Sequence, residues 1–277
     1  NLQMLMDYRQ REQQNLNMQD KIIFYFIIYS FLGWCLESIY KTIIFRKPTN
    51  SGFLYGPFCP MYGIGAIIMI MAGKLSNNIL VIFLMGIVIF TIWEYIVAVV
   101  LEKLFKTKYW DYSNIKFNFQ GRVCLKNSIY WGILAVLLIF VIQPGIEKLT
   151  EIIPNDLIVY LNIIFIIAII VDIGFTLFRI MFIDKKIRQI FEIGDTIKEK
   201  LAEIKNTEGV YKENLQKAIS DLKTKQDILK IKIYKRVIRL KKAFPEMHSE
   251  NLTKFMTQKI TLESIKEKIE KVKKHKE

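Results

Sequence analysis

The residues of this chain best suited to chemistry are ionisable side chains inside long apolar segments. Glu37, Glu94, Asp172 and Arg179 each interrupt a hydrophobic run. Charged groups are costly at membrane depth, so each predicts either a pairing partner or a functional role. At 1.5 Å per helical residue, Glu94 and Asp172 lie about 16 Å, Glu37 about 12 Å and Arg179 about 6 Å from the cytoplasmic ends assigned below.

These four side chains therefore belong to the same half of the membrane, where we expect them to line a shared polar cavity. The alternative is that they serve packing alone, as ion pairs of Asp172 or Glu37 with Arg179 or Lys41. The residue types leave both interpretations open.

A second group of polar residues lies in the aromatic-rich stretch Tyr109–Leu125, between two apolar segments. Amphipathic rings beside polar groups are typical of the membrane–water boundary. Arg122 is an anion-binding candidate because a guanidinium can hold phosphate or carboxylate bidentately, and Gly121 before it allows a close backbone approach. Alternatively, Arg122 follows the charge bias of cytoplasmic loops or pairs with Asp111. The further candidates from this stretch are Asp111, Tyr112 and Asn118, whereas Trp110, Tyr112 and Trp131 are favoured as interfacial anchors.

Metal and nucleophile chemistry find little support. The two histidines, His248 and His275, lie in the polar C-terminal part, and Cys59 and Cys124 are too few for a zinc site without them. We therefore predict no metal and no cofactor, and no Ser/His/Asp or Cys/His arrangement can be assembled among the apolar segments. The motif G-x-x-x-x-G-K-S/T is absent from these residues, so transport driven by ATP would need a separate ATPase subunit.

The elements that must position these groups are predicted to be helices, giving an all-α polytopic membrane bundle with a soluble helical appendage. The length of each apolar run matches what a helix needs to cross a bilayer, or nearly so. The five predicted spans cover residues 22–45, 61–75, 79–105, 129–146 and 157–183, and the fourth is expected to end at a break formed by Gln143, Pro144 and Gly145.

Residues 46–63 are rich in glycine and proline, which excludes a regular helix. Their apolar side chains argue against a solvated loop. A re-entrant or interfacial segment packed against protein is expected, because irregular backbone at membrane depth must find partners. We expect this segment and Tyr109–Leu125 to fold together as a cap over the polar cavity.

Positive charge is distributed unevenly along the chain. Residues 1–183 hold 15 Lys and Arg against 11 Asp and Glu, whereas residues 184–277 hold 25 against 15. Lysine and arginine also concentrate after the first, third and fifth spans, which predicts an external N-terminus and a cytoplasmic C-terminus in a bacterial cell membrane.

Residues 184–277 lose membrane character and form the third of three predicted regions, after a polar arm at 1–20 and a membrane domain at 21–183. Ile187, Ile190 and Ile197 belong to an amphipathic helix pattern that continues to residue 204. Further helices are predicted from 211 to 243 and after an N-cap at Ser249. These helices predict a helical hairpin or coiled coil. Its expected partners are membrane lipids, a separate ATPase subunit or a second copy of the chain. Alternating acids and scarce aromatics argue against nucleic acid.

Several motifs together resemble a bacterial family. They are S-G-F-L-Y-G-P-F-C-P-M-Y-G at 51–63, the pair Trp93-Glu94, W-D-Y-S at 110–113 and F-N-F-Q-G-R-V-C-L at 117–125. The stretch 22–183 is similar to the family described as "Putative ABC-transporter type IV", or ABC transporter permease. The resemblance implies a polytopic membrane protein partnered by an ATPase. Its motif positions fall here on Gly52, Tyr55, Gly56, Pro57, Pro60, Tyr62, Gly63, Glu94, Trp110, Asp111, Tyr112, Asn118, Gly121 and Arg122.

Three functions follow as alternatives. The first is a transporter permease with Glu37, Glu94, Asp172 and Arg122 along its path. The second is a membrane-embedded enzyme acting on a lipid or isoprenoid phosphate headgroup, with Glu94 or Asp111 as the general base. The third is a non-catalytic scaffold or sensor.

Overall fold

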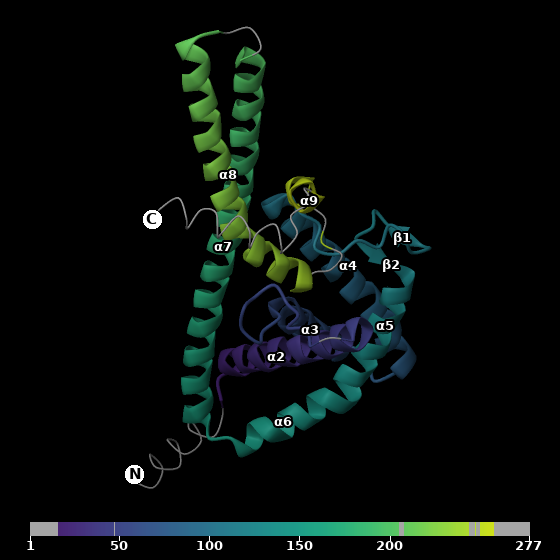
Figure 1. The fold of residues 1–277 in the computed structure, drawn as a ribbon. Helices are drawn as coiled ribbons and strands as arrows, with labels where there is room; N and C mark the ends of the chain where they lie inside the picture. Colours follow the sequence, from purple (N-terminus) through teal and green to yellow (C-terminus); the bar gives the residue numbers. More distant parts are fainter. Residues whose placement is uncertain (1–15, 47, 205–207, 244–246, 248–249, 258–277) are drawn as a thin grey trace. The chain divides into compact units, whose positions relative to one another are not determined.

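The computed structural model describes residues 16–46, 48–204, 208–243, 247 and 250–257, and these residues are almost entirely helical (Figure 1). The helices are α2 (Met18–Phe45), α3 (Pro60–Gly73), α4 (Ile79–Phe105), α5 (Leu125–Leu137), the π-helix η1 (Leu138–Ile142), α6 (Gln143–Ile152), α7 (Asn155–Ile204), α8 (Val210–Ala243) and α9 (Glu250–Thr257). Two short strands, β1 (Asn118–Phe119) and β2 (Val123–Cys124), pair antiparallel. Most of the predicted N-terminal arm, residues 206 and 207 between two predicted helices, and the predicted N-cap Ser249 lie outside the described residues.

Four helical stretches are long and apolar enough to cross a membrane: α2, α4, α7 and the continuous run from Leu125 to Ile152. The prediction of an all-α membrane bundle is thereby confirmed. The remaining predicted span coincides with α3, a shorter apolar helix of 14 residues. Many large apolar side chains on these helices are exposed, as expected where lipid is the solvent.

The predicted break at Gln143, Pro144 and Gly145 is wrong. The helix continues to Ile152 through η1, and Pro144 occupies the first turn of α6. The Gln143 N–H bonds the Leu138 carbonyl, five residues earlier. A local π adjustment lets a membrane helix pass a proline that has no N–H to donate. Residues 147–152, which follow the predicted end of the fourth span, are therefore helical.

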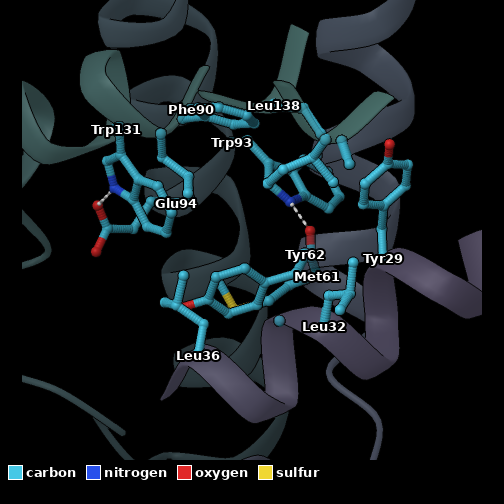
Figure 2. Close-up of a pocket in the computed structure, with 15 residues that line it drawn as sticks. Tyr29, Leu32, Leu36, Met61, Tyr62, Phe90, Trp93, Glu94, Trp131 and Leu138 are labelled. Atoms are coloured by element: carbon cyan, nitrogen blue, oxygen red, sulfur yellow. Dashed lines mark hydrogen bonds between the residues drawn. The ribbon is translucent and has the colours of Figure 1, made fainter. Parts of the chain in front are cut away.

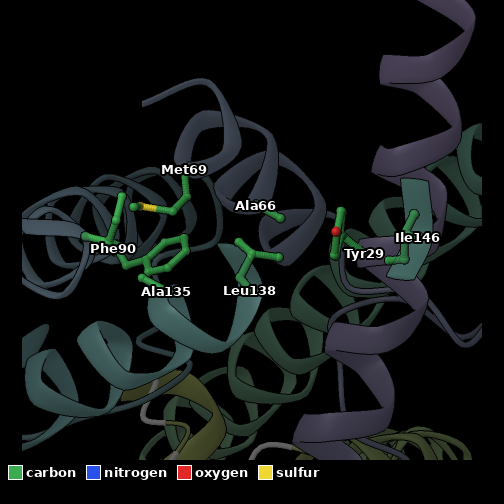
Figure 3. Close-up of a cluster of buried hydrophobic side chains, with 8 residues drawn as sticks. Tyr29, Ala66, Met69, Phe90, Ala135, Leu138 and Ile146 are labelled. Atoms are coloured by element: carbon green, nitrogen blue, oxygen red, sulfur yellow. The ribbon is translucent and has the colours of Figure 1, made fainter. Parts of the chain in front are cut away.

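Glycines allow neighbouring helices to approach closely. A Cβ at Gly63 of α3 would overlap the Ser30 hydroxyl of α2, and a Cβ at Gly86 of α4 would overlap Ala135 of α5. Small residues at contacts of this kind are how membrane helices gain packing energy, because lipid tails are as apolar as the helices themselves. The cluster formed around these contacts joins α2, α3, α4, α5, η1 and α6, and Figure 3 shows Tyr29, Ala66, Met69, Phe90, Ala135, Leu138 and Ile146 within it.

The chain divides into two compact units. One contains residues 1–104 and 110–176, and therefore α2 to α6 with the first part of α7. The other contains residues 105–109 and 177–277. In the second unit α7 and α8 run antiparallel, with Ile187, Ile190, Ile197, Leu215, Ile219, Ile233 and Val237 buried (Figure 1). The predicted helical run from 211 to 243 is confirmed as α8.

Candidate functional site

Between α2 and α3 the glycine- and proline-rich segment is irregular up to Cys59, as predicted, but residues 60–63, which were also expected to be irregular, form the first turn of α3 because Pro60 is tolerated at a helix start. A carboxylate from α7 holds the centre of the irregular part. Asp172 accepts hydrogen bonds from the backbone N–H groups of Tyr55 (3.1 Å) and Gly56 (2.7 Å), and from the Thr176 hydroxyl (3.3 Å). A Cβ at Gly56 would stand 3.0 Å from an Asp172 oxygen, so the backbone approaches the carboxylate closely. The acid at membrane depth in α7 therefore satisfies loop amides that would otherwise lack partners.

A second acid, Glu37 of α2, contacts the end of the same segment. Glu37 forms a salt bridge with Lys41 one turn later (2.7 Å), which is one of the ion pairs considered for packing, and accepts a contact from the Cys59 thiol (3.5 Å). Burial, and next the negative charge of Glu37, raise the pKa of the Cys59 thiol. Cys59 is therefore a protonated structural thiol rather than a reactive thiolate at neutral pH.

A cavity of about 80 Å³ lies between α2, α3, α4, α5 and η1 (Figure 2). Its walls are mostly apolar or aromatic, and Glu94 is the one acid among the residues that line it. The lining residues are Tyr29, Leu32, Gly33, Leu36, Met61, Tyr62, Gly65, Ala66, Phe90, Trp93, Glu94, Trp131, Leu134, Leu138 and Ile142. Glu37 and Asp172 are not among the residues that line this cavity.

Glu94 is 3% exposed and is held by donors from two other elements. Trp131 of α5 donates its indole N–H to Glu94 at 2.8 Å (Figure 2). The Tyr112 hydroxyl donates to the same carboxylate at 3.2 Å. Salt bridges in the described part of the chain include none to Glu94. Hydrogen bonds to a carboxylate orient it, but each ionised oxygen has lone pairs for more than one donor. Glu94 therefore keeps acceptor capacity beside the cavity.

The two irregular segments meet around the ring of Tyr62, in the first turn of α3. Tyr62 packs against the Trp131 ring with centroids 5.7 Å apart, and lies within electrostatic range of Glu37, Glu94 and Tyr112. The neighbouring Met61 carbonyl accepts the Trp93 indole N–H at 2.8 Å (Figure 2). Met61 and Tyr62 line the cavity, and Tyr112 donates to the Glu94 carboxylate beside it, so both segments contribute to its surroundings.

The segment from 110 to 124 is a hairpin braced mainly by its own polar groups. Asp111 accepts from the backbone N–H and the hydroxyl of Ser113. Asn118 donates to the Ile115 carbonyl (2.7 Å) and accepts from the Gly121 N–H (3.0 Å). Gly121 has a φ of +71°, a left-handed conformation that favours glycine. Trp110 donates to the Arg122 carbonyl at 2.9 Å.

Arg122 is committed to an acid of α4. Its guanidinium forms a salt bridge with Glu102 at 2.7 Å, contacts Gln120 and lies over the Tyr95 ring at 5.7 Å. Sequence reasoning missed Glu102 because this acid stands at the polar end of its helix and looks like an ordinary boundary charge. Arg179, the last predicted member, lies on α7 two turns after Asp172, in the other compact unit.

The structure also adds a polar chain that the sequence analysis did not single out. The Tyr29 hydroxyl donates to the buried Gln143 side chain at 2.5 Å, and Gln143 donates to Glu147 at 2.9 Å. Trp131 was expected as an interfacial anchor and instead lines the cavity. The available signal was chemical, because an indole N–H inside an apolar span needs an acceptor and Glu94 is an acid of the neighbouring span.

Comparison with known protein families matches residues 24–177 to the family described as "Putative ABC-transporter type IV". The chain belongs to this family. The match covers α2 to α6 and α7 up to the residue after Thr176, so it includes the cavity and both irregular segments. No curated protein and no solved structure matches the chain. As a member of the ABC-transporter type IV family with apolar span-length helices, this chain is a transporter-related membrane protein.

Proposed function

We propose that this chain is the permease component of a transport system, with its solute contact at the cavity beside Glu94. Membership of an ABC-transporter family carries the proposal. The chain itself shows no G-x-x-x-x-G-K-S/T motif in its 277 residues. The ATPase that supplies energy is therefore proposed to be a separate subunit, and the chain to lie in a cell membrane with its N-terminus outside.

The size and walls of the cavity limit what part of a solute it can receive. At about 80 Å³ it is roughly half the engineered cavity of about 150 Å³ that holds benzene. It would accept a short hydrocarbon segment but not a sugar or a nucleotide. Leu32 and Leu36, which line it, are 38% and 44% exposed on α2. Residues of this kind face lipid, so the solute is proposed to be amphipathic and to enter from the bilayer.

Glu94 is the proposed polar contact of this solute. Trp131 and Tyr112 hold its carboxylate in place, and a hydroxyl or ammonium of the solute would use the remaining acceptor positions. Met61 and Tyr62 follow the irregular segment directly, so a shift of that segment would move one wall of the cavity. Rearrangement of broken or irregular elements around a site near the middle of the membrane is how many transporters alternate access.

A lipid-acting enzyme is the second candidate, because the same lipid-facing leucines border the cavity. Its proposed phosphate-binding group, Arg122, is paired with Glu102 and would have to leave that acid to hold a headgroup. The permease proposal requires no such exchange.

The antiparallel pair formed by α7 and α8 is the proposed docking element for the ATPase, and we propose residues 184–277 as a cytoplasmic helical domain. Lys217 and Lys223 on α8 are exposed, so their charges are available to a partner. Charge reversal with Lys217→Glu and Lys223→Glu is expected to lower recovery of the ATPase while leaving the membrane part folded.

The test is purification of the full chain from its native membrane, followed by mass spectrometry of co-purified proteins and lipids. We expect an ATPase subunit with the wild type, and an amphipathic molecule that is depleted in Glu94→Gln but retained in the matched variant Glu102→Gln on the same helix. Recovery of no ATPase would reject the permease assignment and favour a scaffold or an enzyme. Equal retention by both variants would reject Glu94 as the contact.

A further inference from the structure

Phe117 is an exposed phenylalanine at the open end of the 110–124 hairpin, immediately before β1. Phe117 is 80% exposed and adopts a φ of +56°. A bulky residue in the left-handed region is uncommon, because its Cβ lies close to the following carbonyl oxygen. An apolar ring is thus presented outward by a backbone conformation that it does not favour.

The hairpin holds this ring in a defined place. The Phe117 carbonyl accepts the backbone N–H of Leu125 at 3.0 Å, which fixes Phe117 against the first residue of α5. The next residue, Asn118, starts β1 and bonds the Ile115 carbonyl. On the same strand Phe119 is 59% exposed and packs against Tyr95 of α4, with ring centroids 5.6 Å apart. Phe117 therefore lies at the start of α5, and Phe119 lies against the side of α4 at Tyr95.

The exposed rings continue the lipid-facing surface of α5. Leu125, Ile129, Ile133 and Leu137 recur at four-residue intervals, which places them along one side of the helix, and each is between 42% and 49% exposed. In a membrane helix an exposed aliphatic stripe of this kind faces lipid. Since the Leu125 N–H is bonded to the Phe117 carbonyl, the exposed Phe117 lies next to the first residue of this lipid-facing stripe.

From this continuity we propose that the hairpin is an interfacial anchor, with Phe117 and Phe119 inserted at the boundary between phospholipid headgroups and acyl chains. The partner is the bilayer itself. Exposed Lys116 beside Phe117 supplies a cation that can contact lipid phosphates while the rings occupy the apolar side. The anchor fixes the depth of Tyr112, whose hydroxyl is the second donor to Glu94.

The experiment places a tryptophan at position 117 of the full-length protein in vesicles of phosphatidylcholine and phosphatidylglycerol. Phe117→Trp keeps an aromatic ring at the site. The matched control is Asn114→Trp, an exposed position in the same loop. Emission of each variant is compared with the wild type, because the four native tryptophans contribute to all of them. Quenchers are lipids brominated on the acyl chain near the headgroup, and aqueous iodide.

We expect Phe117→Trp to add a blue-shifted component that the brominated lipids quench and iodide does not, and Asn114→Trp to add a component that iodide quenches. Phe119→Trp should behave like Phe117→Trp, so the test does not depend on the folding of one variant. Iodide quenching of the Phe117→Trp and Phe119→Trp components to the same extent as the control would overturn the proposal. That result would favour a surface for a soluble protein partner instead.

Discussion

The two irregular segments beside the Glu94 cavity are stabilised in different ways. The segment from 48 to 59 takes its strongest polar support from the spans: Asp172 of α7 binds the amides of Tyr55 and Gly56, and Glu37 of α2 contacts Cys59. The hairpin from 110 to 124 relies on Asp111, Asn118 and its own backbone. One segment should therefore respond to changes inside the membrane bundle, and the other should keep its shape when the bundle changes.

This difference suggests separate roles. A loop held by carboxylates from two helices shifts when those helices move relative to each other. Such a shift can move one wall of the cavity. A self-supporting hairpin can hold Tyr112 at a constant depth. The following substitutions test the contrast, in order of decreasing expected effect.

Asp172→Ala should have the largest effect. It removes a charged acceptor from two backbone N–H groups in a partly buried site, for an expected loss of about 3 kcal/mol in unfolding free energy. The measurement is the denaturation midpoint in mild detergent. Asp111→Ala is the matched control, because Asp111 also accepts two hydrogen bonds but in an exposed turn, where about 1 kcal/mol is expected. Equal losses for the two variants would remove the proposed contrast.

Gly121→Ala should come next and should act on the hairpin alone. A Cβ at this position would overlap the Ser113 hydroxyl and approach an Asp111 oxygen, and the left-handed backbone adds about 1–2 kcal/mol. Hydrogen exchange should rise at Tyr112, Gly121 and Leu125 while the amides of Tyr55 and Gly56 keep their protection. The control Gly145→Ala places its Cβ in open space within α6 and should be neutral or slightly stabilising. Faster hydrogen exchange at Tyr55 and Gly56 as well as in the hairpin would show that the two segments are coupled.

Glu37→Gln should speed maleimide labelling of Cys59 at pH 8 by about threefold to tenfold. The thiolate is the reactive form, and the charge of Glu37 helps to raise the thiol pKa, so removal of this charge lowers the pKa and increases the thiolate fraction. Burial remains, so labelling should stay far slower than in the unfolded chain. Cys59 is followed by peptide mass spectrometry, with Glu102→Gln as the control. An unchanged rate would mean that Glu37 does not influence the end of this loop.

Arg122→Ala should have the smallest effect on stability. Its pair with Glu102 is 20% and 30% exposed, and pairs of this kind contribute about 0–1 kcal/mol. The same denaturation assay applies, with Glu102→Gln expected to give a similar value. A loss above that of Gly121→Ala would show that the hairpin depends on α4 more than its internal bonds indicate.

The apolar runs were sufficient to predict the membrane bundle, because a membrane span can be recognised from its length and composition alone. The third predicted span matches α4 at both ends, and the irregularity of both loop segments followed from their glycine, proline and polar content. The partners of the intramembrane acids could not be read in the same way. Asp172 bonds residues more than a hundred positions earlier, and only the packing of α7 against Leu54 and Phe58 brings them together. Likewise, the distances along the helices placed Glu94 and Asp172 in the same half of the membrane but did not indicate which helices are neighbours.

The π-helix in the span from Leu125 to Ile152 changes the direction in which the later side chains of that span point. A π turn accommodates one residue more than an α turn, so the residues after it are rotated by about 100° relative to an uninterrupted α-helix. This rotation is what brings Gln143 round to the Tyr29 hydroxyl. Deletion of one residue between Leu138 and Ile142 would restore regular winding, shorten the helix by about 1.5 Å and turn Gln143 and Glu147 together toward a different neighbour.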